Sequence, residues 1–552
     1  MSAMSRAAKT GGPFALAIFL AISVSTATVA AIHTVGPGET YATLNALRLA
    51  GVLQNGDTIV LNGDDSSLTA AFTANLTFTG SGIISPASSN VRLSTGAVTF
   101  AADPSDPAAP LVFSGFKPSS GNAGVAVTTG NITFSGGKNT FSGNSSASWG
   151  GVFYNQSGTN VTLSGGTNTF SNNTAGNNGG AIHTGYTVIT GGENTFSGNT
   201  SAAQGGAIYS WNGTTISNGT NLFSGNMASD GGAIHSGNGG GTATTVITGG
   251  ENTFIGNKAR GLGGAIYAQH NATLRAAADK GDFTFRGNRD GVDAAGNGGK
   301  ANAMHFNGGT LTLAAEGTQS ITFYDPITMT NTSRTIHINN QATDTGSIVF
   351  DGSDYTRPED KLSAVYGSTT VGYGELALKG SVVFGGAANV GSFTLNASAT
   401  LSSDEATNRI RANTMTLNGS VDVANGGTLE LAANSGVTFN GTLNVGLGTE
   451  SFGCLDVSGD LTFGNGAKLS LYWDDSFAGL YDGWMNTYDM SDLFAASTIT
   501  GGFSDYDFIA KDGFTATWDG AVLTLSYVPE PTTLAVLGLG WAGLGLARRR
   551  RR

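Results

Sequence analysis

Cysteine is nearly absent from this sequence, and charged residues are scarce. Cys454 is the only cysteine in 552 residues, which excludes a disulfide framework and a thiolate metal site. Asp, Glu, Lys and Arg make up 12% of the chain, about half of the usual ~25%. No basic stretch occurs before the last five residues, so the clustered cations that nucleic-acid phosphates require are missing. We therefore expect no nucleic-acid partner.

Glycine is abundant instead, with 85 residues, and apolar residues make up 39% of the chain. Serine, threonine and asparagine supply most of the polar remainder. Because Gly, Thr and Asn form helices poorly, this composition favours strands joined by tight turns. The apolar fraction is large enough for a buried core, which argues against a disordered chain.

The N-terminal residues 1–31 have the pattern of a secretory signal peptide. Arg6 and Lys9 precede an apolar run from Phe14 to Val24, and small residues follow as far as Ala31. This order predicts export and removal by signal peptidase. A membrane anchor is the alternative, but the run is shorter than the ~20 residues that span a bilayer.

The C-terminal residues 528–552 form a second targeting segment. The motif Val528, Pro529, Glu530 and Pro531 is followed by sixteen apolar or small residues, 532–547. The chain then ends in a basic tail, which consists of Arg548, Arg549, Arg550, Arg551 and Arg552. Five arginines are expected to keep the C-terminus on the cytoplasmic side of a membrane.

In order, spacing and position this segment resembles the PEP-CTERM sorting signal. The resemblance implies that an exosortase-type membrane protease recognises the motif and removes the tail. It also implies a Gram-negative bacterium that makes extracellular polysaccharide, and transient insertion of a C-terminal hydrophobic helix into the inner membrane. A plain tail anchor is the alternative.

A short motif recurs along the middle of the chain, every 26 to 31 residues. Its phenylalanine and the asparagine three residues later occur at Phe141 and Asn144, Phe170 and Asn173, Phe196 and Asn199, Phe223 and Asn226, Phe254 and Asn257, and Phe285 and Asn288. Glycine pairs follow, among them Gly205 and Gly206 before Ile208, Gly231 and Gly232 before Ile234, and Gly263 and Gly264 before Ile266. Such a period is typical of solenoid and propeller proteins.

Each repeat contains three short segments in which apolar and polar residues alternate. Three strands in about 27 residues fit one rung of a parallel β-helix, whereas a propeller blade needs four strands and ~40 residues. We therefore expect an all-β fold: a right-handed parallel β-helix with an N-terminal signal helix and a C-terminal hydrophobic sorting helix.

Strand alternation also assigns the faces of each rung. An apolar ladder is expected to stack inward at Phe153, Ile182, Ile208, Ile234, Ile266 and Met304. The next position is expected to point outward, at Tyr154, His183, Tyr209, His235, Tyr267 and His305. Stacked asparagine amides should bond from rung to rung, and the glycine pair should form a tight corner.

The paired GGAI and FxxN motifs resemble the polymorphic outer-membrane-protein repeats of bacterial surface proteins. The resemblance covers roughly residues 131–310 and extends to segments at 321–327 and 346–356. It implies a surface-displayed, adhesive β-helix. The chain departs from that family at its end, where a sorting tail replaces the translocating β-barrel, so export by another route is expected.

These observations divide the chain into five parts. A signal peptide, 1–31, precedes N-terminal cap rungs of the β-helix, 32–130; the GGAI/FxxN repeat β-helix occupies 131–310, further rungs and a C-terminal cap 311–527, and the sorting signal 528–552. For residues 374–527, a separate β-sandwich is the alternative to a continuing solenoid.

Candidate catalytic and metal-binding groups are few. Glu193 and Glu251 occupy the same turn position in two repeats. These repeats are two rungs apart, a distance of about 10 Å, and we interpret both residues as solvated turn residues. The histidines of the outward ladder alternate with tyrosines, which is too far apart for one zinc ion. We therefore expect no catalytic residue, no metal and no cofactor.

Nine aspartates and several aromatic residues cluster between Trp473 and Asp519. They are interpreted as a solvated C-terminal cap, with calcium or glycan contact as the alternative.

The sequence thus predicts an exported surface or extracellular-matrix protein with a structural or adhesive role. Its expected partners are signal peptidase, an exosortase, and extracellular polysaccharide or other surface components. A polysaccharide lyase or hydrolase and an autotransporter-type passenger are the alternatives.

Overall fold

The computed structural model describes residues 30–527, with gaps at 89, 104–105, 156–157, 238–242, 331–332, 387–390, 448–450, 474–484, 490–492, 510–513 and 519–521. The predicted signal peptide as far as Val29 and the whole sorting segment therefore lie outside the described residues. In the described part of the chain, no helix is long and apolar enough to cross a membrane.

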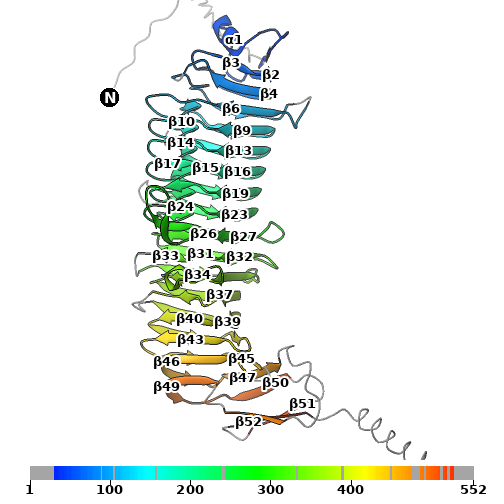
Figure 1. The fold of residues 1–552 in the computed structure, drawn as a ribbon. Helices are drawn as coiled ribbons and strands as arrows, with labels where there is room; N and C mark the ends of the chain where they lie inside the picture. The colour runs from blue at the N-terminus through cyan, green and yellow to red at the C-terminus, as the bar shows by residue number, and fades with distance from the viewer. Residues whose placement is uncertain are drawn as a thin grey trace, which may run out of the picture.

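Almost every element is a β-strand that pairs in parallel with strands one repeat before and one repeat after it. The rungs stack one below another into a long column (Figure 1). The prediction of an all-β parallel β-helix is confirmed.

The FxxN strands form the first ladder of the column. It consists of β9 (Lys138–Ser142), β13 (Thr167–Ser171), β16 (Glu193–Ser197), β19 (Thr220–Ser224), β23 (Glu251–Ile255) and β27 (Phe283–Arg286). Their phenylalanine rings are fully buried and lie face to face, with centroids 4.8 Å apart for Phe170 and Phe196. The stack runs from Phe113 to Phe350, well beyond the repeats on either side.

The GGAI strands form the second ladder and the following strands form the third. The second consists of β11 (Phe153–Asn155), β15 (Ile182–Ile189), β18 (Ile208–Ile216), β21 (Ile234–Ser236), β25 (Ile266–Ala268) and β30 (Met304–Phe306). The third joins β12 (Asn160–Leu163) and the second halves of β15 and β18 to β22 (Thr244–Ile247), β26 (Ala272–Ala276) and β31 (Thr310–Ala315). The structure places the expected inward ladder, from Phe153 to Met304, in the buried core.

A fourth, very short ladder follows each asparagine, where the sequence predicted only a turn. It consists of β10 (Ser145–Ser146), β14 (Thr174–Ala175), β17 (Thr200–Ser201), β20 (Met227–Ala228), β24 (Lys258–Ala259) and β28 (Arg289–Val292). All but β28 have two residues, which are too few for a visible alternation, so the sequence pattern could not indicate these strands.

Steric constraints explain why glycine occupies both positions of the glycine pair. Gly205 has a φ of +68°, a left-handed conformation that suits glycine. Gly206 lies against the next rung: a Cβ on it would come within 1.9 Å of the Gly232 carbonyl oxygen. Neither position therefore accepts a side chain without moving the backbone.

The two ends of the column are closed differently. At the N-terminal end, β1 (Ile32–Val35) pairs in parallel with β2 (Thr58–Asn62), and the short helix α1 (Leu44–Ala50) buries Leu44 and Leu47. The sequence predicted cap rungs but no helix here. Thr43 caps α1 by accepting a hydrogen bond from the backbone nitrogen of Ala46 at 3.1 Å, and Gly51 ends the helix in a left-handed conformation.

Parallel pairing also continues downstream of the repeats. It runs through β37 (Ser368–Lys379), β39 (Ser392–Ser403), β46 (Cys454–Phe463) and β47 (Lys468–Trp473) to β50 (Asp505–Ile509). A small antiparallel sheet of β48 (Met485–Asp489), β51 (Phe514–Trp518) and β52 (Val522–Tyr527) follows at the C-terminal end (Figure 1). The Asp-rich cluster falls in this region, where side chains lie outside what the structure describes.

Candidate functional site

The asparagines of the FxxN motif form a continuous buried ladder along one corner of the column. Each amide donates from Nδ2 to Oδ1 of the next asparagine, at 2.9–3.1 Å from Asn144 to Asn288. Asn199, for example, also donates from Nδ2 to the Phe170 carbonyl at 2.9 Å, and its Oδ1 accepts the backbone N–H of Asn173 at 3.1 Å. Every asparagine in the ladder is fully buried.

A buried aspartate ends this ladder. Asp325 accepts hydrogen bonds from Asn288 Nδ2 at 2.7 Å and from the backbone nitrogens of Gly287 and Asn288 at 2.8 Å. The Tyr355 hydroxyl also donates to it. Burial raises the pKa of the Asp325 carboxyl despite these bonds. The arrangement pairs polar groups inside the fold and has no opening to solvent, so we assign it a structural role.

A second asparagine ladder, which the sequence analysis missed, occupies the second position of the FxxN strands from β9 to β23. Asn139, Asn168, Asn194, Asn221 and Asn252 bond from amide to amide at 2.9–3.0 Å. The signal was present in the recurring Asn-Thr-Phe sequence. The asparagine amides of both ladders bond mainly to polar groups of the chain itself, so we assign both a structural role.

The predicted Tyr/His ladder is present as a continuous ring stack. Consecutive centroids lie 4.7–5.4 Å apart from Tyr154 to His305. Most of these rings are nevertheless buried: His183 is 9% exposed, and Tyr209, His235 and His305 are at most 1% exposed. The adjoining turns cover the rings, as the stacking of Trp149 on Tyr154 at 5.6 Å illustrates.

Burial keeps the histidines of this stack neutral. Loss of solvation lowers the pKa of His183 to about 4, of His235 to about 3 and of His305 to about 4. Nδ1 of His183 and Nδ1 of His235 have no hydrogen-bond partner among the described residues. A proton on either ring would therefore be a buried charge without a counter-ion. A tyrosine separates successive histidines, and the described residues contain no group of three His, Cys, Asp or Glu that could hold a metal ion.

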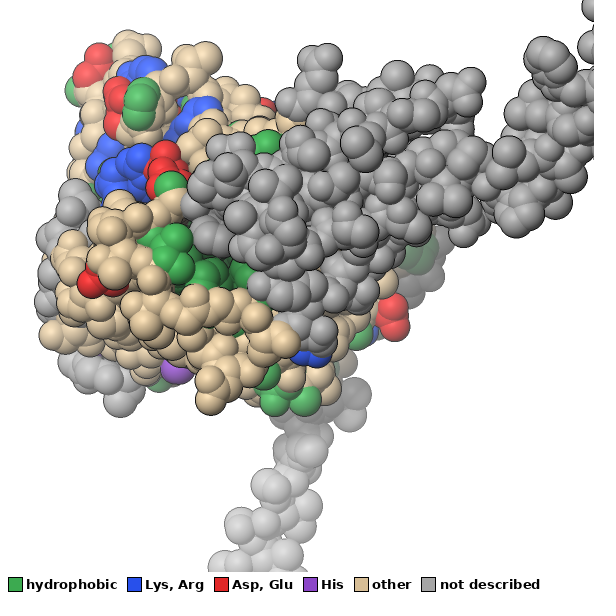
Figure 2. Space-filling model, turned by 90° about the horizontal axis from the view of Figure 1, so that it is seen from below, with side chains coloured by type: hydrophobic (Ala, Val, Ile, Leu, Met, Phe, Trp, Pro, Cys, Tyr) green, Lys and Arg blue, Asp and Glu red, His purple; other side chains and the backbone are tan. Residues whose placement is uncertain are grey.

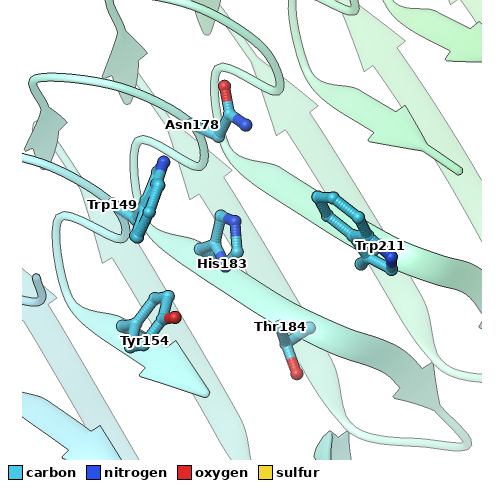
Figure 3. Close-up of a pocket in the computed structure, with 6 residues that line it drawn as sticks. All are labelled: Trp149, Tyr154, Asn178, His183, Thr184 and Trp211. Carbon is cyan, nitrogen blue, oxygen red and sulfur yellow. The ribbon is translucent and has the colours of Figure 1, made fainter. Parts of the chain in front are cut away.

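A half-open pocket of about 210 Å³ lies at the first rungs of this stack. Its lining consists of Trp149, Tyr154, Asn178, His183, Thr184 and Trp211. Figure 3 shows the two indole side chains on either side of the His183 ring. Neither tryptophan was singled out by sequence reasoning, although each interrupts the repeat at an aligned position.

The candidate acids lie elsewhere. Glu193 and Glu251 start β16 and β23, are exposed, and pair in register with Thr220 between them. The structure thus leaves them exposed at strand starts two rungs apart, and neither lines the pocket.

Two family models match the chain. The PEP-CTERM protein-sorting motif matches residues 528–552, and the Chlamydia polymorphic membrane protein repeat matches 140–156, 169–185, 195–210 and 253–269. No curated protein and no solved structure matches it. With the fold, these matches indicate an exported cell-surface β-helical protein whose tail is processed by an exosortase during export.

The buried histidines predict acid sensitivity. Their pKa values lie below the unfolded value of 6.5, so the unfolded chain binds protons first, and stability present above pH 6.5 is lost as the pH falls toward 4. Each histidine should cost roughly 2 kcal/mol at pH 5. The raised pKa of Asp290, about 6, opposes this effect, so wild type and variant must be compared.

The His235→Phe variant isolates one histidine and keeps the ring stack. Between pH 7 and pH 5, its unfolding free energy in urea, followed by circular dichroism, should fall by about 2 kcal/mol less than that of the wild type. Equal losses in the two proteins would show that His235 is protonated in the fold.

Proposed function

We propose that this protein is an exported scaffold of the cell envelope or extracellular matrix of a Gram-negative bacterium, with structural or adhesive work and no catalytic reaction. The observation that best supports this proposal is the position of the repeated residues inside the fold. Phenylalanines, asparagines and glycines of the motif are all used to stack one rung on the next. What the repeat leaves for other molecules is its outer surface.

The composition of that surface suits a matrix protein. Seen from the C-terminal end, uncharged polar side chains and backbone cover most of the described surface, with a few acidic and basic groups close together (Figure 2). A large field of one sign, which would draw polyanions to the surface, is not visible from this side. Extracellular polysaccharide is the partner that we propose for this mostly polar surface.

The sorting segment supplies the route. Residues 532–547 would form about 24 Å of helix, which is shorter than the ~30 Å hydrocarbon core. That length suits transient presentation to an exosortase in the inner membrane better than permanent anchoring. Signal peptidase would act at the other end of the chain, near Ala31.

The absence of chemistry is the second part of the proposal. Acid/base catalysis of glycoside hydrolysis needs two carboxyl groups that flank one bond. Glu193 and Glu251 are exposed at the starts of strands that are separated by β19. As far as the structure describes its lining, the pocket of the Tyr/His stack contains no Asp or Glu.

The sorting proposal predicts distinct failures for the parts of the tail. Replacing Pro529, Glu530 and Pro531 with alanine should leave an uncleaved, membrane-bound precursor. Replacing the five terminal arginines with glutamine should let the tail slip through the membrane and escape processing, whereas the matched lysine variant, which keeps the charge, should be processed normally. Mass spectrometry of the mature C-terminus, with membrane and medium fractions separated, provides the measurement.

Retention of residues 532–552 by the native protein, in a host that has an exosortase, would contradict the sorting proposal. The chain would then be a plain tail-anchored protein.

The second prediction is the lack of turnover. Purified protein incubated with pectin, alginate and other uronic-acid polymers, with calcium present, should release no unsaturated or reducing ends. Release that disappears in Glu193→Gln or Glu251→Gln would identify a polysaccharide lyase or hydrolase instead.

A further inference from the structure

We propose that the pocket between Trp149 and Trp211 binds a sugar ring of an uncharged polysaccharide. This inference rests on the proposed surface function and deepens it, because it names a site and a ligand class for the adhesive work. It takes its support from the shape, the charge and the sequence position of the pocket.

The walls of the pocket are aromatic and come from different rungs. Trp149 precedes the glycine pair before β11, whereas Trp211 lies within β18, two rungs further along the column. Rings of Tyr154 and His183 lie 5.1 Å apart and join the two sides. Trp149 stacks on Tyr154 and tilts against His183 at 5.7 Å. The flat carbon-rich faces of a pyranose ring pack well on such aromatic surfaces, since both are apolar and rigid.

Among the described residues, the pocket has no charged group to attract an ion: none of its lining residues is Asp, Glu, Lys or Arg. His183 is neutral near pH 7, because its pKa is lowered to about 4 by burial. A quaternary ammonium ion would find aromatic faces here but no carboxylate, and a uronic acid would find no cation. An uncharged sugar needs neither a carboxylate nor a cation as a counter-ion.

Polar groups at the rim fit sugar hydroxyls. The Asn178 Oδ1 accepts the backbone N–H of Gln204 at 3.1 Å, which fixes the amide. Its NH₂ group donates to no acceptor in the described part of the chain and is therefore able to donate a hydrogen bond to a ligand. Few convergent polar groups on a mostly apolar lining are typical of small-molecule sites. The half-open shape lets a chain continue beyond the bound ring.

Both tryptophans depart from the repeat. At the position of Trp149, before the glycine pair, the other rungs have Asn178, Gln204, Asp230 and Leu262. Trp211 directly follows Ser210, which pairs with Thr184 and Ser236. At the position of Trp211, the other rungs have Gly185, Gly237 and Gln269. Stacking of the rungs therefore requires neither indole. Two independent departures that line one pocket indicate a site rather than a structural element.

Oligosaccharide titration of the full mature chain tests the proposal. The probes are hexamers of glucose, mannose, galactose, xylose and N-acetylglucosamine, with tetramethylammonium and oligogalacturonate as charged comparisons, followed by tryptophan fluorescence and calorimetry. At least one neutral hexamer should bind. Trp211→Ala should weaken that binding by about tenfold or more, while Trp211→Tyr, which keeps an aromatic face, should lose less.

The matched control is Ile255→Ala. Ile255 is 43% exposed, comparable with the 37% of Trp211, and does not line the pocket. Its affinity should equal that of the wild type, and all variants should unfold at the same urea concentration. The proposal is overturned if no neutral hexamer binds, if Trp211→Ala binds as well as the wild type, or if only tetramethylammonium or oligogalacturonate binds.

These outcomes are separate from the sorting test. A chain that is processed and exported but binds no sugar contradicts the pocket assignment alone, whereas a tail-anchored chain that binds sugar contradicts the sorting proposal alone.

Discussion

The structure depends on one polar constraint: each rung turns a corner inside the fold, and the backbone groups of that corner must find partners away from water. An unpaired buried donor or acceptor costs about 1–3 kcal/mol. Asparagine meets the constraint because its amide both donates and accepts along the column axis. Asn199 bonds to Asn173, Phe170 and Asn226, so one side chain connects three rungs.

This constraint explains both the regularity and the freedom of the sequence. Phenylalanine, asparagine and the glycine pair must return to the same place on every rung. The turns between them need not, and the repeats vary from 26 to 31 residues. Trp149, which has no counterpart in other rungs, lies in such a turn, whereas Trp211 lies within β18 where its register with β15 shifts. The scaffold is periodic, and the pocket between these two tryptophans is built from residues that depart from the period.

The end of the ladder follows from the same need for hydrogen-bond partners. Asn288 has no asparagine to bond to, and Asp325 takes that place as an acceptor only. An aspartate cannot continue the ladder while it is ionised, since it has no N–H to donate. The Asn repeat ends at this rung, although the phenylalanine stack continues to Phe350.

Much of the fold could be predicted from the sequence, because stacking of identical rungs repeats the signal many times. The period, the strand alternation and the inward ladder all follow from residues such as Phe196 and Ile208. Other features leave no periodic trace: the two-residue strand β17 is too short, and helix α1 occurs once. Burial of Tyr209 could not be predicted either, because strand alternation places it on the outer face and does not show what packs there.

The candidate site was only half predictable, for a related reason. The Tyr/His stack is periodic and was found from the sequence. The pocket beside it is lined by Trp149 and Trp211, which are 62 positions apart in the chain. They line the same pocket only when the rungs are stacked in register. An alignment of the repeats against one another would have revealed both as exceptions.

Hydrogen exchange in an Asn199→Ala variant tests most directly whether the asparagine ladder holds the rungs together. Asn218→Ala, which changes an exposed asparagine in a turn, is the matched control. We expect backbone amides around Asn173 and Asn226 to exchange about a hundredfold faster in Asn199→Ala, because buried groups lose their partners, and at the wild-type rate in Asn218→Ala. Equal exchange in the two variants would contradict a ladder that holds the rungs together.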